Sequence, residues 1–156
     1  FRHTCFFTGH RAIPANERER IIKQTVSICT HLINEYNVNI FVAGGALGFD
    51  TIAAIEILKL KKIYPHIQLH LYIPCIDQAS KWRNRDIELY NKIKEMANEV
   101  KYISNAPYTS GCMQQRNRAM VHDAFYGVAY CTNTKSGTYS TVRYAKDKGR
   151  NVLIIE

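Results

Sequence analysis

The sequence of 156 residues contains no long apolar run and no paired cysteine motif. Crossing a bilayer takes roughly 20 consecutive apolar residues, and the longest candidates, such as residues 152–155, are only as long as a strand. We therefore expect no membrane segment. The cysteines are odd in number and dispersed, without a CxxC pair or a histidine cluster at ligand spacing, which favours reduced thiols over disulfides or a metal site. They are Cys5, Cys29, Cys75, Cys112 and Cys131.

Several signatures of enzyme classes are also missing. No Gly-Lys-Ser/Thr closes a phosphate loop, no GxGxxG fingerprint follows a strand, and no GxSxG elbow marks a serine hydrolase. No secretory signal pattern is visible in the given chain, which begins at Phe1. The content of 46% hydrophobic and 22% charged residues is that of a globular protein. We therefore expect a globular, cytoplasmic protein.

The basic excess lies mostly in the second half of the chain. The formal net charge is +8, because residues 1–78 hold 8 basic and 6 acidic side chains whereas residues 79–156 hold 13 and 7. A positive field favours phosphate-bearing partners, although a basic soluble surface gives the same balance. The charge does not separate a nucleotide from a nucleic acid.

Short apolar runs alternate with helical patterns along almost the whole chain. Six strand-like runs separated by helices indicate a mainly parallel sheet covered by helices on both faces. Right-handed crossovers then give an α/β, Rossmann-like, doubly wound fold. Because no linker or repeat interrupts the pattern, residues 1–156 are expected to form a single domain. The six expected strands are residues 5–7, 40–43, 69–73, 100–103, 128–130 and 152–155.

The third expected helix follows a looser stretch at residues 75–85. Its apolar residues Leu89, Ile93 and Met96 or Ala97 recur at helical spacing, so we expect this face to point inward. In a doubly wound sheet the ligand site lies at the carboxyl ends of the strands. The loops expected at that edge are residues 8–11, 44–50, 74–83, 104–112 and 132–138.

The loop at residues 44–50 reads GGALGFD and joins a buried strand to a helix. Gly44, Gly45 and Gly48 let the backbone approach a phosphate and adopt positive φ, and the helix that follows offers N–H groups and a positive dipole end. Asp50 is a candidate to hold a ribose hydroxyl or a base, or to cap the helix. A tight turn without a ligand has the same pattern.

The loops after the first and third strands add further candidates. Gly9 permits a close turn, while His10 and Arg11 can donate to a phosphate or stack on a base. Trp82, the only tryptophan, lies with Gln78 just after the third strand, where an aromatic ring can stack on a base or pack beneath a loop.

Two later helix starts complete the set of candidate ligand-binding residues. Arg116 and Arg118 lie two positions apart and so point to different faces, and we expect Arg116, with its neighbour Asn117, to face the cleft. Gly137 and Thr138 follow a polar loop at the start of the last helix, which suits a phosphate or a ribose but also a plain capped turn.

Together these segments resemble the YpsA-like family of the SLOG superfamily, which also includes DNA-processing protein A and the cytokinin-activating phosphoribohydrolases. The resemblance extends from about residue 4 to residue 155 and implies a Rossmann-like fold that binds nucleotides or nucleotide-derived ligands. The matching pieces are residues 8–11, residues 44–50, Pro74 with Gln78 and Trp82, and residues 113–117 with Met120 and Val121.

The chain departs from the phosphoribohydrolases at one position that matters for catalysis. Their PGGxGTxxE segment corresponds to residues 135–141, where the Gly-Thr pair is kept and Thr141 stands in place of the catalytic glutamate. Arg116 matches the arginine of their MxxRK segment. The resemblance therefore implies binding on the phosphate side without the acid that cleaves the glycosidic bond.

Three functions remain open at this point. The first is a sensor or regulatory module that binds a nucleotide or nucleotide sugar at the carboxyl ends of the strands. The second is a nucleotide N-glycosidase or phosphoribohydrolase-like hydrolase with Asp50 as its candidate catalytic carboxyl, and with Asp77, Asp86 and Glu88 as the other carboxylates nearby. The third is single-stranded nucleic-acid binding through the basic second half, Trp82 and Tyr108. No other cofactor is assigned, and a homodimer rests only on analogy with related Rossmann proteins.

Overall fold

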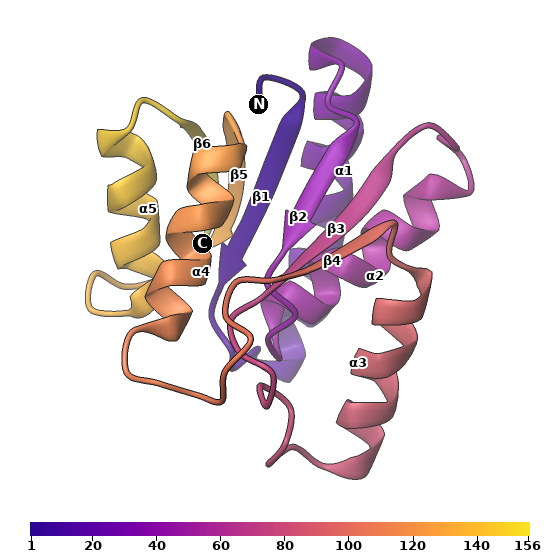
Figure 1. Ribbon diagram of the computed structural model, residues 1–156. Helices are drawn as coiled ribbons and strands as arrows, with labels where there is room; N and C mark the ends of the chain where they lie inside the picture. The colour runs from indigo at the N-terminus through magenta and orange to yellow at the C-terminus, as the bar shows by residue number, and fades with distance from the viewer.

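The computed structural model describes residues 1–156 and contains one six-stranded sheet in which every pair of neighbouring strands is parallel. The spatial order is β4-β3-β2-β1-β5-β6, so the direction of winding reverses between β1 and β5. The carboxyl ends of the strands lie at the bottom of Figure 1. The strands are β1 (Thr4–Gly9), β2 (Ile40–Ala43), β3 (Gln68–Ile73), β4 (Glu99–Tyr102), β5 (Tyr126–Tyr130) and β6 (Asn151–Ile155).

Helices cover both faces of this sheet. The first three helices pack on one face and the last two on the other, as Figure 1 shows. A single 3-10 turn, η1 (Ala15–Glu17), precedes the first helix. The helices are α1 (Arg18–Tyr36), α2 (Phe49–Lys61), α3 (Asn84–Met96), α4 (Cys112–Asp123) and α5 (Gly137–Asp147).

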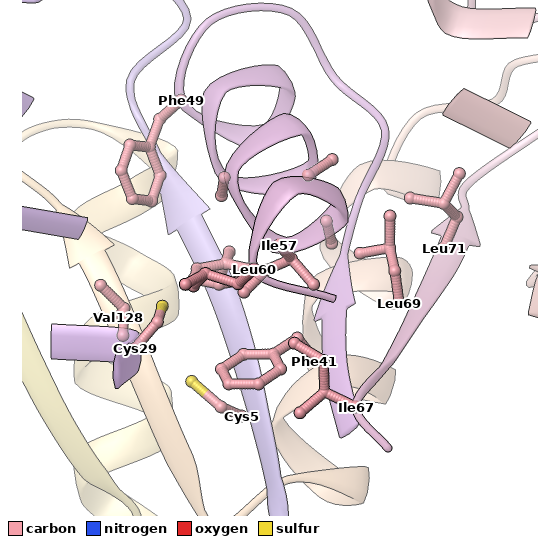
Figure 2. Close-up of a cluster of buried hydrophobic side chains, with 14 of the residues drawn as sticks. Cys5, Cys29, Phe41, Phe49, Ile57, Leu60, Ile67, Leu69, Leu71 and Val128 are labelled. Atoms are coloured by element: carbon pink, nitrogen blue, oxygen red, sulfur yellow. The ribbon is translucent and has the colours of Figure 1, made fainter. Parts of the chain in front are cut away.

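The larger core lies between the sheet and helices α1, α2 and α3. Alternate residues of each strand point to this face, so Cys5, Phe41 and Leu69 lie together beneath α2 (Figure 2). Helix α2 is buried over most of its length and contributes Ile57 and Leu60 to the same cluster. Burial on both sides explains why the central strands are continuous apolar runs.

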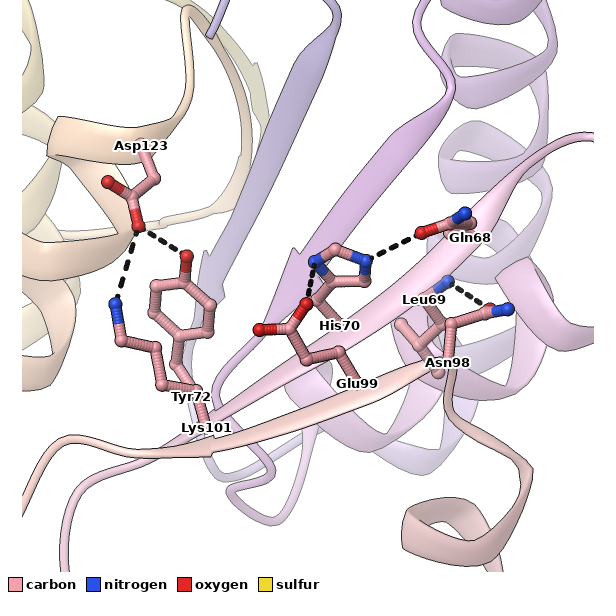
Figure 3. Close-up of polar contacts among 8 residues, drawn as sticks. All are labelled: Gln68, Leu69, His70, Tyr72, Asn98, Glu99, Lys101 and Asp123. Carbon is pink, nitrogen blue, oxygen red and sulfur yellow. Dashed lines mark hydrogen bonds and ion pairs between the residues drawn. The ribbon is translucent and has the colours of Figure 1, made fainter.

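The opposite face is only partly covered, because α4 and α5 leave the β3–β4 half of the sheet open to its own polar side chains. Tyr72 donates its hydroxyl hydrogen bond to Asp123 at the end of α4, and Lys101 lies 4.0 Å from the same carboxylate (Figure 3). The His70 ring lies 3.7 Å from a carboxylate oxygen of Glu99. These contacts give the edge strand β4 a polar surface.

The structure confirms the predicted Rossmann-like fold and the order of its elements. The expected inward face of α3 is confirmed at Ile93, which is buried, and wrong at Leu89 and Met96, which are 37% and 49% exposed. Tyr90 is buried instead of Leu89, and Ala97 packs half-buried against the core. Tyr90 and Ile93 belong to the larger core, whereas Leu89 lines a cavity between α2 and α3. No helix has the length and apolar character needed to span a membrane.

Candidate functional site

A cavity of about 280 Å³ opens at the carboxyl ends of β1 and β5, where the winding of the sheet reverses. We call it the switch-point cavity. Doubly wound sheets bind ligands at this position because the loops of neighbouring strands turn away in opposite directions. Its lining comes from the loops after β1, β2 and β5 and from α4: Thr8, Gly9, His10, Arg11, Ala46, Asp50, Arg116, Asn117, Ser136, Gly137 and Thr138.

The glycines of residues 44–48 are required by close packing of the loop itself. A side chain at Gly44 would collide with Arg116 and the Asp50 carboxylate, which press against this point of the backbone. Gly48 has φ +83°, and a side chain there would collide with the backbone carbonyl of Arg11. The loop is therefore held in one shape by contacts on both sides, and any ligand meets it already formed.

Asp50 lies in the first turn of α2, and its side chain turns back toward the loop. It is 6% exposed, and the Ala46 N–H donates to its Oδ2 at 3.4 Å. Burial raises the pKa of Asp50 to about 6, against the opposing effects of the Arg116 charge and of backbone hydrogen bonds. Asp50 does not cap the helix, because Gly48 occupies the N-cap position. The cavity wall therefore carries a buried carboxyl group with a raised pKa.

Arg116, on α4, is 4% exposed and tethers three segments of the chain. Its Nη1 donates to the carbonyl of Gly44 and, at 3.3 Å, to that of Tyr72. Its Nε donates to Asn117 Oδ1 at 2.8 Å. Burial lowers the pKa of Arg116, and the Asp50 carboxylate opposes this effect. The guanidinium thus fixes the glycine loop while adding positive charge to the wall of the cavity.

His10 also serves as a tether. The backbone N–H of Thr132 donates to His10 Nε2 at 2.9 Å, which requires Nε2 to be unprotonated. Burial lowers the pKa of His10, which favours the same neutral form. The ring joins the loops that follow β1 and β5, so only Nδ1 remains to donate to a ligand.

The start of α5 forms the opposite wall of the cavity. Ser136 is the N-cap, and its Oγ accepts a hydrogen bond from the Tyr139 N–H at 3.1 Å. Gly137 and Thr138 follow in the first turn, where N–H groups and the positive dipole end face the cavity. This arrangement suits an anionic group of a ligand.

A second cavity, also of about 280 Å³, lies between α2 and α3 on the other side of the glycine loop. We call it the α2–α3 cavity. Trp82 and Tyr90 contribute its aromatic wall, and their rings meet edge to face with their centroids 5.1 Å apart. Gln78 packs behind the loop, and its Nε2 donates to the Tyr90 hydroxyl at 3.4 Å while its Oε1 is buried without a partner.

The structure divides the predicted site residues between these places. Gly9, His10, Arg11, Asp50, Arg116, Asn117, Gly137 and Thr138 line the switch-point cavity. Gly45, Gly48 and Trp82, again with Asp50, line the α2–α3 cavity, whereas Gly44 and Gln78 line neither. Thr8, Ala46 and Ser136 also line the switch-point cavity; they lie in loops that the sequence placed at this edge but were not singled out as candidates. Ser136 could have been found, because a serine just before a Gly-Thr helix start is a common N-cap.

Comparison with solved structures supports the fold, and this chain matches one part of each of two larger proteins. DNA processing protein A from Helicobacter pylori, described for its single-stranded DNA binding mode, is 19% identical with a TM-score of 0.70; the match covers 98% of this chain and 65% of that one. The protein of the same name from Streptococcus pneumoniae is also 19% identical, with a TM-score of 0.72, and 50% of it is covered.

Sequence comparison identifies bacterial relatives. An uncharacterized SPbeta prophage-derived protein of Bacillus subtilis, YoqJ, is 30% identical over 132 residues, which cover 78% of this chain and 77% of YoqJ. A UPF0398 protein of Halalkalibacterium halodurans is 38% identical over 74 residues, which are 47% of this chain and only 39% of that relative. The family model described as the YspA SLOG family matches residues 5–154. Because this match extends over nearly the whole chain, the chain belongs to the YspA SLOG family.

Proposed function

We propose that this protein binds a nucleotide or nucleotide-derived ligand in the switch-point cavity, in a sensor or regulatory role. The observation that carries the proposal is the convergence of the α5 N-terminus, Asp50 and the buried Arg116 on one cavity at the winding reversal, with Ala46 of the glycine loop in its wall. A helix N-terminus and a positive side chain both favour an anion. Membership of the SLOG family agrees with this role.

We propose different tasks for the two ends of the cavity. A phosphate would lie at Gly137 and Thr138, where the first-turn N–H groups of α5 point. Asp50 lies on the opposite side, at the start of α2, and its carboxyl can accept a hydrogen bond from a ribose hydroxyl. Arg116 offsets the charge of both groups.

The test is calorimetric titration with a panel of AMP, ADP, ATP, cyclic nucleotides, NAD and ADP-ribose. Thr138→Val removes a hydroxyl from the cavity wall and keeps the side-chain volume, so it should lower the affinity for the ligand at least five-fold. Thr30→Val, made in half-buried Thr30 of α1, is the matched control and should leave affinity unchanged. Absence of binding by every compound, or equal affinity in both variants, would contradict the proposal.

The same samples test the hydrolase alternative. An N-glycosidase would release free base from the bound nucleotide, and Asp50 is the carboxyl in the cavity that could supply a proton near neutral pH. Chromatography of the titration mixture after incubation shows whether base is released. Release that is lost in Asp50→Asn would establish turnover, and unchanged nucleotide would restrict the role to binding.

A second candidate function, single-stranded nucleic-acid binding, is favoured by the surface beside the cavity. The loops after β3 and β4 are joined by hydrogen bonds from the Ile76 N–H to the Ala106 carbonyl and from the Tyr108 N–H to Asp77. They expose Ile76 and Tyr108, which are 56% and 62% accessible. Exposed basic side chains lie near this edge: Lys81, Arg83, Arg85, Arg118 and Lys135.

Aromatic stacking combined with basic charge is the usual basis of single-strand binding, and the Helicobacter pylori neighbour in fold is described as a single-stranded DNA binder. Affinity for a dT oligonucleotide should fall steeply between 50 and 200 mM salt, because phosphate contacts release counterions. Tyr108→Ala should weaken it several-fold, whereas Tyr36→Ala, at the C-terminus of α1, should not. Equal binding by both variants would exclude the Tyr108 surface.

A further inference from the structure

The α2–α3 cavity has an apolar interior and aromatic sides. Its floor is Leu71 of β3, and Ala54 of α2 faces Leu89 of α3 across it. Tyr90 and Ile93 of α3 are buried in the larger core, whereas Leu89 lines the cavity and is 37% exposed. Half of the lining residues are hydrophobic, and a concave space of this kind can hold part of a small molecule.

A wall of backbone separates this cavity from the switch-point cavity. The Phe49 N–H donates to the His10 carbonyl at 3.1 Å, and Gly48 packs directly against the Arg11 carbonyl. The loops after β1 and β2 are therefore joined between the two spaces. An occupant of the α2–α3 cavity would lie on the far side of this wall, and its binding does not depend on the function proposed above.

The mouth of the cavity carries arginines without carboxylate partners. Arg18, from the start of α1, and Arg85, from the start of α3, both line it, and neither forms an ion pair. The Arg11 guanidinium lies over the Trp82 ring at 5.7 Å from its centroid, at the same side of the molecule. Asp50 and Asp86 also line the cavity, so the excess of positive charge depends on Arg11 together with Arg18 and Arg85.

We propose that the α2–α3 cavity is a second binding site, for a planar ring that carries an anionic group, such as a purine nucleotide. The ring would enter between Trp82 and the aliphatic wall, and the anion would remain at Arg18 and Arg85. A volume of about 280 Å³ lies at the lower limit of small-molecule pockets, roughly 300 Å³, which suits one ring system with its charged group outside. Stacking on an aromatic side chain and pairing with arginine are strongest in combination, because the arginines orient the ring.

Trp82 makes the proposal directly measurable, since it is the only tryptophan in the chain. Its fluorescence should change saturably on titration with AMP, more weakly with adenosine, which lacks the anion, and not with ribose 5-phosphate, which lacks the ring. Arg85→Gln should lower the affinity for AMP at least five-fold and change the affinity for adenosine by less than two-fold. Arg143→Gln, which changes an exposed arginine on α5 at the other face of the sheet, should leave both affinities unchanged.

The outcomes distinguish this site from the switch-point cavity. A fluorescence response that persists in Thr138→Val and is weakened in Arg85→Gln supports a second site. If AMP binds by calorimetry while Trp82 fluorescence stays constant, or if Thr138→Val abolishes the response, the α2–α3 cavity is not a site and the switch-point proposal stands. Equal AMP affinity in Arg85→Gln and Arg143→Gln would also overturn the proposal.

Discussion

Replacing Asp50 by asparagine should change how the stability of the protein depends on pH. The Asp50 carboxyl is 6% exposed, and burial raises its pKa from 3.8 to about 6. A raised carboxyl pKa means that the folded state holds the proton more tightly than the unfolded state. Ionisation of Asp50 therefore lowers the free energy of unfolding as the pH rises from about 4 to about 6, and the loss is complete above that window.

The size of this effect follows from the shift in pKa. Each unit corresponds to about 1.4 kcal/mol, so a shift of about two units predicts a loss of roughly 3 kcal/mol between pH 4 and pH 7. An asparagine side chain cannot ionise, so the Asp50→Asn variant lacks this loss. The substitution also changes the free energy of unfolding in other ways, for example through the altered surroundings of Arg116. That change is the same at every pH and does not affect the slope.

Urea denaturation of both proteins at half-unit steps from pH 4 to pH 8 measures the prediction. Titrations of other carboxylates and histidines occur in both proteins and cancel in the difference between them. The stability of Asp50→Asn relative to the unsubstituted protein should rise through pH 4–6 and then level off. A difference that is constant across this range would refute the reasoning, because it would mean that Asp50 ionises in the folded state as it does in water.

The remaining predictions concern packing and are read as free energies of unfolding in urea. Gly48→Ala should lower the free energy of unfolding by about 3 kcal/mol, because Gly48 has a positive φ and the new methyl group would collide with backbone. Gly137→Ala places its methyl group in open space and should change the free energy of unfolding by less than about 1 kcal/mol. Equal costs would contradict this account of the loop. Arg116→Lys should lower the free energy of unfolding by about 3 kcal/mol, because a lysine cannot donate to Gly44, Tyr72 and Asn117 at once. An unchanged free energy of unfolding would show that these hydrogen bonds do not stabilise the fold. Tyr72→Phe should cost about 1 kcal/mol through loss of the hydroxyl bond to Asp123 (Figure 3), and no change would assign that bond no net value.

The central strands could be predicted from the sequence because strands buried on both faces are apolar runs, and the run at residues 40–43 coincides with β2. The run at residues 152–155 lies within the edge strand β6 and predicted it by its apolar composition, although only Ile155 of that strand is buried. Helix faces were harder to assign. On α3, Leu89 and Met96 fit the helical period as well as Tyr90 does, and only the position of the helix over the sheet decides which of them is buried.

The candidate site was predictable in its position and less so in its contacts. The rule that ligands bind at carboxyl ends placed Asp50 and Thr138 at one edge, and both line the switch-point cavity. It could not show that His10 accepts a hydrogen bond from Thr132, or that Arg116 binds the carbonyl of Gly44. Those contacts join segments that are distant in sequence, so no local pattern encodes them.

The rigidity of the glycine loop bears on both proposed sites. Arg116 holds it from the α4 side, and the Arg11 carbonyl packs against Gly48 from the β1 side. A loop held from both sides loses little conformational freedom when a ligand binds, so more of the interaction energy appears as affinity. The same rigidity makes the loop a shared wall: Asp50 lines the cavities on both sides of it. Ligand affinities at the two sites should therefore respond together to Asp50→Asn, whereas Thr138→Val and Arg85→Gln should each affect one site alone.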